Sequence, residues 1–155
     1  MATKKKRRGW IEPLIYAEIQ KLMPILCVDI VIQRSDGKFL LLKRRNYPAK
    51  GKWWTPGSKL DKGERLSRAA IRIAKEEVGM KIQIIKRIGS PFEMFFRKGP
   101  FETPVHVVEI IFLVRPVQEA TVRLDFQSDA WRWASKLPKH LPWASIVNEA
   151  AAQKD

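Results

Sequence analysis

The sequence predicts a single α/β domain with a mixed β-sheet. A chain of 155 residues that is 45% hydrophobic is long enough to close one core and too apolar to be disordered. Helical and extended patterns both occur, but they do not alternate in the regular order of a purely parallel sheet. No internal repeat and no change of composition divides the chain. We therefore expect one domain over residues 10–155, preceded by a basic flexible tail over residues 1–9.

The first half of the chain is predicted to hold two helices and two strands. Apolar residues at helical spacing predict a helix over 13–22, and Pro24 then begins a β-branched extended segment over 25–32. The Asp-Gly pair of "RSDGK" is typical of a hairpin whose returning strand is "FLLLKRRN". A loop rich in proline and glycine follows. The next helix is expected from about Glu64 to Val78, stopped by Gly79.

The second half is predicted to contain four more strands and a last helix. The four strands are the segments "KIQIIKRIG", "PFEMFF", "VHVVEIIFLVRPV" and "AWRWAS". The segment "LPWASIVNEAAAQK" reads as a helix with Pro142 near its first turn, where proline is tolerated.

The charge and the cysteine content limit the possible partners and the compartment. A net charge of +14 attracts polyanions, so phosphorylated ligands, RNA and DNA are all plausible partners. The run Lys4–Arg8 suits a nucleic-acid arm, a nuclear localisation signal or a solvated tail, and no RNA- or DNA-binding signature accompanies it. The only cysteine, Cys27, lies in an apolar run, which predicts a buried inert thiol and excludes disulfides and thiolate zinc sites.

Hydropathy indicates a soluble protein. No apolar run approaches the roughly 20 residues that a membrane span needs, and the basic start is not followed by the apolar core of a signal peptide. Together with the single cysteine, this favours a cytoplasmic protein with no membrane partner.

Paired acids in the stretch "PGSKLDKGERLSRAAIRIAKEEVGM" indicate a metal site. Glu76 and Glu77 fall near the end of the predicted helix, and the turn at Gly57 brings free carbonyls close to it. Adjacent carboxylates and a backbone carbonyl suit Mg²⁺ or Mn²⁺, which could bridge to a diphosphate. The alternative is a solvated helix face in which the two acids pair with Arg72 and Lys75.

The same stretch resembles the motif of the Nudix hydrolases, G-x5-E-x7-R-E-U-x-E-E-x-G-U, where U is bulky and apolar. The motif positions fall on Ser58, Glu64, Arg72, Ile73, Ala74, Lys75, Glu76, Glu77, Val78, Gly79 and Met80. This resemblance implies the family's α/β/α sandwich with a mixed sheet, a divalent cation and hydrolysis of a nucleoside diphosphate linked to another group.

Two departures from the motif affect this prediction. The first glycine is replaced by Ser58, although Gly57 just before it can supply the turn and a carbonyl. The acid after the arginine is Ile73, so one of three helix carboxylates is absent. We expect fewer metal ions than in the family, one in number; the alternative is a scaffold that no longer catalyses.

The stretch "LLLKRRNYPAKGKWWTPGSKLDKGERL" is similar to the GDP-mannose mannosyl hydrolase subgroup, and the resemblance runs from about Leu22 to Trp133. It implies Mg²⁺ ligands at Gly57, Glu77 and Gln127, to which the motif pair adds Glu76. It also implies diphosphate contacts from Arg44 and Lys59, and site roles for Arg72 and for Asp29 in the first strand.

The chemistry implied by this subgroup leaves the general base open. Its members direct water to the anomeric carbon of the sugar, whereas ordinary Nudix hydrolases direct it to phosphorus. The subgroup's basic histidine corresponds to Ser128, which cannot take a proton at neutral pH without a base of its own. Asp125 and Asp129 are the nearby substitutes, and Glu76 is the candidate for attack at phosphorus. The subgroup's tyrosine near the diphosphate is replaced by Val107.

Several site residues also have structural interpretations. Arg72 could be a salt bridge to Glu64 that ties the glycine loop to the helix, and Arg44 and Arg45 should point to opposite faces of their strand. A buried charge at Asp29 needs a partner, which favours a site-supporting role.

Two functions from different classes follow from these residues. The first is a Mg²⁺-dependent Nudix hydrolase of a nucleoside diphosphate derivative, such as a nucleotide sugar. The second is a noncatalytic module that binds phosphate ligands or RNA. The subgroup resemblance also implies a homodimer, with the N-terminal helix and strand as a possible contact.

Overall fold

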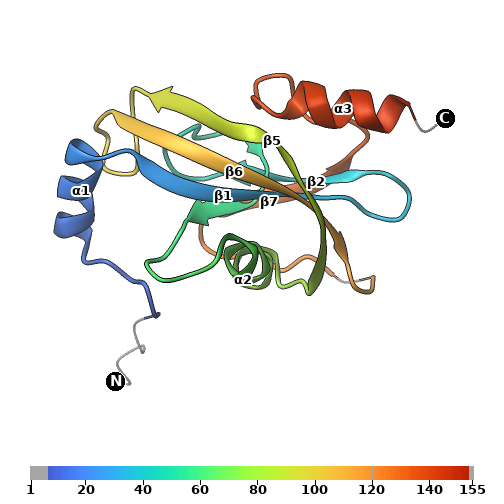
Figure 1. Cartoon of the computed structure of the whole chain (residues 1–155), viewed down its shortest axis with the longest axis horizontal. Helices are drawn as coiled ribbons and strands as arrows, with labels where there is room; N and C mark the ends of the chain where they lie inside the picture. The colour runs from blue at the N-terminus through green and yellow to red at the C-terminus, as the bar shows by residue number, and fades with distance from the viewer. Residues whose placement is uncertain (1–6, 120, 154–155) are drawn as a thin grey trace.

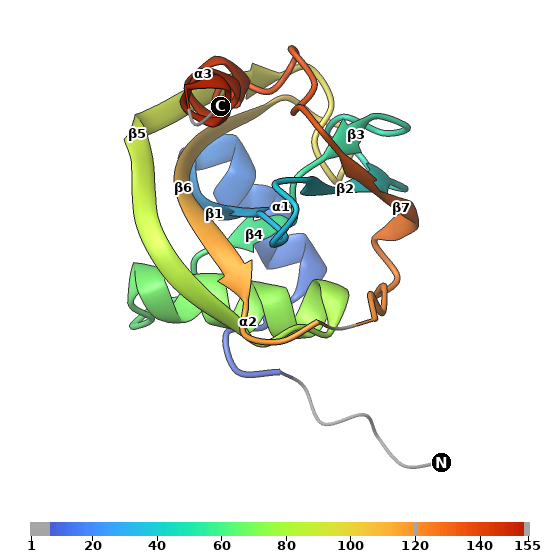
Figure 2. The ribbon, with the colours of Figure 1, turned by 90° about the vertical axis from the view of Figure 1, so that its right-hand side faces the viewer.

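The computed structural model describes residues 7–119 and 121–153, so Lys4 to Lys6 of the basic run lie outside the described residues. Sheets lie between two helices: α2 (Leu66–Val78) covers one side and α3 (Ala144–Ala152) the other (Figures 1 and 2). The fold is therefore a mixed α/β sandwich, as predicted. In this described part no helix is long and apolar enough to span a membrane.

The larger sheet brings together the strands that carry the candidate acids. Its order is β4 (Gly57–Lys59), β1 (Ile25–Ile32), β6 (Val105–Pro116) and β5 (Ile82–Phe96). Strands β1 and β6 are parallel, and the other two pairs are antiparallel. The register sets Cys27 beside Glu109 and Asp29 beside Gly57. Since alternate residues of a strand share one face, Cys27 and Asp29 project to the same side.

The smaller sheet has the order β3 (Trp53–Trp54), β2 (Phe39–Arg44) and β7 (Ser128–Ala134). The short strands β3 and β4 lie where a loop was predicted. Conversely, the two strands predicted over 81–89 and 91–96 form the single strand β5. Its register shifts between Ile88 and Phe92, where Gly89 has a φ of +61°, so the Gly and Pro signals mark an irregularity in pairing and not an end of the strand.

The helices begin and end close to where the sequence predicts. Helix α1 (Pro13–Leu22) is capped by Glu12, whose carboxylate accepts a hydrogen bond from the Ile15 amide. Helix α2 ends at Gly79, whose φ of +70° is the left-handed conformation that glycine adopts without strain.

Position 73, where the motif has an acid, lies on the side of α2 that faces the sheet. Ile73 is fully buried and packs in a cluster with Val28 and Ile30 of β1 and with Val78. A second cluster, which includes Trp143 and Leu141, lies under α3. An acid at position 73 would have no place in the first cluster unless a partner neutralised it, so the chain uses this position for packing.

Candidate functional site

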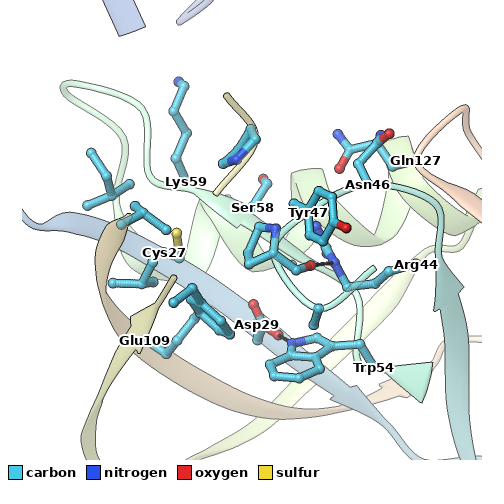
Figure 3. Close-up of a pocket in the computed structure, with 18 of the residues that line it drawn as sticks. Cys27, Asp29, Arg44, Asn46, Tyr47, Trp54, Ser58, Lys59, Glu109 and Gln127 are labelled. Atoms are coloured by element: carbon cyan, nitrogen blue, oxygen red, sulfur yellow. Dashed lines mark hydrogen bonds between the residues drawn. The ribbon is translucent and has the colours of Figure 1, made fainter. Parts of the chain in front are cut away.

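A cavity of about 540 Å³ collects most of the residues singled out from the sequence. Its wall is built by α1, β1, β4 and β6, by the loop after β2 and by the loop before β7 (Figure 3). Five of the predicted site residues line it: Asp29, Arg44, Gly57, Lys59 and Gln127. The other four lie outside the lining: Arg72, Glu76, Glu77 and Asp129.

Glu77 connects the end of α2 to the glycine turn. Its side chain is buried, and its Oε2 accepts a hydrogen bond of 2.9 Å from the Gly57 amide. Burial raises the pKa of Glu77 well above its usual range, and the negative charges of Asp125 and Asp29 add to this effect. A side chain at position 57 would collide with the Asp29 carboxylate, which explains why this position is a glycine.

The loop before β7 is attached to the same end of α2. The Arg123 amide donates to the Val78 carbonyl at 3.0 Å, and the Asp125 amide donates to the Glu77 carbonyl at 3.2 Å. Asp125 Oδ1 in turn accepts from the Gln127 amide at 2.9 Å. Burial, and to a smaller extent the charge of Glu76, raises the pKa of Asp125. This loop therefore places a third carboxyl near Glu77 and presents Gln127 to the cavity.

Two further carboxyls near Glu77 share its buried setting. Asp29, Glu77 and Asp125 all have raised pKa values because burial disfavours their charged forms, and the positive charge of Arg44 only partly offsets this. Within the described ranges, no three His, Cys, Asp or Glu side chains form a group that could hold a metal ion. Oxygens from the backbone and from an amide would have to complete the set, as Gly57 and Gln127 can.

Glu76 and Arg72 take part in ion pairs between α2 and the glycine loop. Arg72 donates to Glu64 at 2.7 and 2.9 Å and to the Lys59 carbonyl at 3.1 Å, which ties the glycine loop to α2. Glu76, whose side chain is 38% exposed, accepts from Arg72 Nη1 at 3.2 Å and lies 3.7 Å from Arg7 Nε. The geometry thus matches the alternative in which Arg72 is a salt bridge, and catalytic roles for Arg72 and Glu76 stay predictions.

The N-terminal segment contacts this loop. Arg7 donates to Asp61 at 2.5 Å, and Lys59 Nζ bonds both Asp61 at 2.7 Å and the Gly9 carbonyl at 2.8 Å. Burial would raise the pKa of Asp61, but the hydrogen bonds from Arg7 and Lys59 outweigh it and lower the pKa to about 2. Of the predicted tail, residues 1–6 lie outside the described residues, while Arg7 lines the cavity.

The two adjacent arginines of β2 and its loop point apart. Arg44 lines the cavity, and its Nε donates to the Pro48 carbonyl at 2.7 Å, which fixes the guanidinium. Arg45 forms a surface ion pair with Asp129 at 2.7 Å, in which both side chains are about half exposed. Asp129 therefore lies away from the cavity that it was predicted to serve.

Asp29 has the buried setting expected of a site-supporting residue. Its Oδ2 accepts from Trp54 Nε1 at 3.1 Å and from Thr55 Oγ1 at 2.9 Å, and burial raises its pKa to about 6. Neither histidine lines the cavity: His106 stacks on Phe95, and His140 Nε2 lies 2.8 Å from the Trp53 carbonyl.

Sequence reasoning missed Glu109, and it predicted a buried thiol at Cys27, whose side chain is only half-buried. Glu109 is a lone acid in the apolar segment "VHVVEIIFLV", the same signal that singled out Asp29. It is buried and lines the cavity, where burial and then the charge of Asp29 raise its pKa well above its usual range. Cys27 also lines the cavity, and burial raises the pKa of its thiol, which keeps it neutral.

Comparisons with known proteins identify the family. A family model described as NUDIX domain matches residues 23–137. The low-salt glycan biosynthesis protein Agl8 of Haloferax volcanii is 43% identical over 80 residues, which are 52% of this chain and 50% of that protein. The ADP-ribose pyrophosphatase of Methanocaldococcus jannaschii is 35% identical over 94 residues, which are 60% and 52%. The matched regions thus span about half the length of these curated relatives.

Solved structures extend the likeness over most of the chain. The MutT NUDIX hydrolase from Burkholderia pseudomallei is 27% identical with a TM-score of 0.62, covering 82% of this chain and 97% of that chain. The MutT protein from Methanosarcina mazei has a TM-score of 0.64 at 24% identity, covering 84% and 95%, which shows a shared fold.

Proposed function

This chain belongs to the Nudix family, and from that premise we propose that it hydrolyses a nucleoside diphosphate linked to a further group. The observation that carries the proposal is the position of Glu77, buried and bonded to the Gly57 turn beside a cavity of about 540 Å³. Arg44 and Lys59 in the wall of this cavity supply the positive charge that a diphosphate needs.

One Mg²⁺ or Mn²⁺ would be held by Glu77, by the Gly57 carbonyl and by Gln127. When bound, such an ion would neutralise diphosphate charge and stabilise the leaving group. Glu76 is already bonded to Arg72, so the proposal assigns metal binding to one carboxylate of the motif pair. Asp125 keeps the neighbouring loop against Glu77, which supports a role in positioning Gln127.

Arg44 and Lys59 would bind the two phosphates. The bond from Arg44 to the Pro48 carbonyl orients its guanidinium before substrate arrives, and preorganised charge is the strongest electrostatic aid to catalysis. Lys59 is held by Asp61 and by the Gly9 carbonyl, with only 17% of its side chain exposed. The two cations therefore come from different strands, β2 and β4, and can contact different phosphates.

The base that replaces the missing histidine is better assigned to Asp125 than to Asp129. Asp125 is bonded to the backbone next to Glu77 and Gln127, whereas Asp129 is paired with Arg45 on the surface. Attack at the sugar carbon and attack at phosphorus are both compatible with a base at this place.

The further group on the diphosphate is proposed to be a sugar. The printed names of two relatives, a glycan biosynthesis protein and an ADP-ribose pyrophosphatase, support a nucleotide sugar such as GDP-mannose or ADP-ribose. We propose on the same grounds that the chain belongs to the GDP-mannose mannosyl hydrolase subgroup.

The test is turnover of GDP-mannose, ADP-ribose, nucleoside triphosphates and dinucleoside polyphosphates with Mg²⁺ in ¹⁸O-labelled water. Label on the sugar would establish attack at carbon, and label on phosphate would establish attack at phosphorus. Glu77→Gln should abolish turnover and the matched change Glu76→Gln should not. Turnover that survives in Glu77→Gln would refute the assigned site.

A noncatalytic binding module is the second candidate, because Ile73 is buried and Glu76 is paired, which leaves Glu77 alone of the three helix positions. Binding of nucleotides without turnover of any of them would favour it.

An RNA partner, a cytoplasmic location and a domain over residues 10–155 stay predictions. So does a homodimer through α1, which exposes Leu14 and Leu22, and light scattering would test it.

A further inference from the structure

The end of the cavity next to α1 contains acceptor atoms that lack hydrogen-bond donors. Gln20 is 5% exposed and Glu109 is 6% exposed, and both line the cavity. Among the described residues, neither Gln20 Oε1 nor Glu109 Oε2 has a hydrogen-bond partner. Buried polar atoms are nearly always paired in folded proteins, so two such acceptors in one cavity need an explanation.

Neighbouring residues fix the positions of both side chains. Gln20 and Tyr16 lie one turn apart on α1, and their side chains interact: burial raises the pKa of Tyr16 to about 12, and the contact with Gln20 offsets part of this effect. Glu109 on β6 lies beside Cys27 in the parallel pair of β1 and β6, and its carboxyl also forms a hydrogen bond with Asp29, while its Oε2 has no partner. Both acceptors are therefore held by regular secondary structure.

Part of this end of the cavity is apolar. Ile25, Val105 and Val107 line it with apolar side chains. Arg44 and Gln127 lie on the opposite side of the cavity from Cys27 and Glu109 (Figure 3). Arg44 on one side of the cavity thus suits phosphate, and the unpaired oxygens on the other side suit a group with N–H or O–H donors. Lys59, whose strand position pairs with Cys27, lies nearer the second side (Figure 3).

We propose that Gln20 and Glu109 form a subsite that accepts hydrogen bonds from uncharged hydroxyl or amino groups of the moiety joined to the diphosphate. This inference rests on the proposed function, because it takes the diphosphate to lie at Arg44 and Lys59. Two parts of one substrate could supply such donors, namely the hydroxyls of a sugar and the N–H groups of a nucleobase. A site whose buried acceptors pair only with the right ligand discriminates strongly against analogues that lack the donor.

The experiment measures binding of GDP-mannose, GDP and IDP by calorimetry, with Ca²⁺ in place of Mg²⁺. The variants are Glu109→Gln, which replaces one acceptor by a donor, and Gln20→Leu, which removes the other. Glu93→Gln is the matched control: it makes the same chemical change on β5, at a side chain that is 59% exposed and outside the cavity lining. Mg²⁺-dependent turnover of the same proteins is followed in parallel.

Both variants should weaken binding on the order of tenfold, because each leaves a ligand donor unpaired. A loss confined to GDP-mannose would place the sugar in the subsite. An equal loss for GDP and GDP-mannose, with a lost preference for GDP over IDP, would place the base there. The melting temperature of Glu109→Gln should equal or exceed that of the wild type, since the change removes a buried acid, so weaker binding would not reflect misfolding.

Affinities equal to those of Glu93→Gln for all three nucleotides would overturn the subsite, and unchanged turnover in that case would leave the proposed function standing. Wild-type protein that neither binds nor hydrolyses any nucleotide tested would instead overturn the proposed function, and the subsite with it.

Discussion

Two groups of carboxyls in this molecule have opposite surroundings. The ion-pair cluster consists of Arg7, Lys59, Asp61, Glu64 and Arg72. The second group, here called the cavity floor, consists of three buried acids: Asp29 and Glu109 in the cavity lining, and Glu77, which is bonded to Gly57 of the lining. Each acid of the cluster has a cation within 4 Å, whereas no described cation lies that close to an acid of the floor. Accordingly, the pKa values of Asp61 and Glu64 are lowered and those of the floor acids are raised.

This difference separates residues that stabilise the fold from residues that serve the site. The chain carries a net charge of +14, so cations are plentiful, yet the fold places three of them around the glycine loop and no described cation within 4 Å of a floor acid. Uncompensated buried acids cost folding free energy and are characteristic of functional sites. We expect the cluster to control stability and the floor to control activity, with Lys59, which belongs to the cluster and also lines the cavity, contributing to both.

The largest expected effect is on activity. Glu77→Gln should lower kcat on the order of a thousandfold, because it removes the one buried carboxylate bonded to the glycine turn. The neighbouring Glu76→Gln, which alters an exposed partner of Arg72, should change kcat only a fewfold. Steady-state kinetics on the substrate found in the panel measures both, and a larger loss in Glu76→Gln would reverse the roles assigned to the two acids.

The next effect is on stability and belongs to the cluster. Arg72→Met should lower the free energy of unfolding by about 3 kcal/mol, since it leaves Glu64 without its two hydrogen bonds in a partly buried position. Arg45→Met breaks a half-exposed pair with Asp129 and should cost about 0.5 kcal/mol or less. Urea denaturation of the two variants compares them, and equal losses would mean that the cluster is no more than a surface feature.

Much of the fold could be predicted because its signals are local. Helix α1 and strand β1 have the predicted bounds, and α2 ends at Gly79, because periodicity and a left-handed cap are properties of consecutive residues. Strands β3 and β4 have two and three residues, so only their pairing partners define them. The continuity of β5 likewise depends on its partner β6.

The site was predicted less completely, because contacts between residues distant in sequence bring part of it together. The motif positioned Gly57 and Glu77, and the wider resemblance selected Arg44, Lys59 and Gln127, all near the cavity in the structure. No motif marks Glu109 or Gln20, because they reach the cavity through the parallel pairing of β1 with β6 and through the packing of α1. Asp125 and Asp129 could not be separated, since the direction of a side chain in a loop is set by contacts distant in sequence.

The two groups of acids should also respond to pH with opposite signs. The folded pKa of Asp29 is about 6 against 3.8 for the free side chain, so between these values the folded state holds a proton that the unfolded state has released. Stability from this residue is therefore greatest below pH 4 and is lost as the pH rises through 6, by at most about 3 kcal/mol. Asp61, with a folded pKa of about 2, contributes stability above pH 4 that is lost as the pH falls towards 2.

Matched variants test that opposition. Asp29→Asn should be more stable than the wild type at pH 7 and no more stable at pH 4, because the amide has no charge to bury. Asp61→Asn should be less stable than the wild type at pH 7. Denaturation curves at the two pH values measure this, and a destabilised Asp29→Asn at pH 7 would show that the hydrogen bonds from Trp54 and Thr55 outweigh the burial of the charge.

The smallest effect should come from Arg7, where the ion-pair cluster is redundant. Arg7→Ala breaks the bond to Asp61, but Lys59 Nζ at 2.7 Å and Arg72 Nε at 3.6 Å still compensate that carboxylate. Because the Arg7 side chain is itself 37% exposed, the loss in unfolding free energy should be below about 1 kcal/mol. Arg8→Ala, an exposed neighbour, is the control. A loss as large as that of Arg72→Met would mean that the N-terminal segment, and not α2, holds the glycine loop in place.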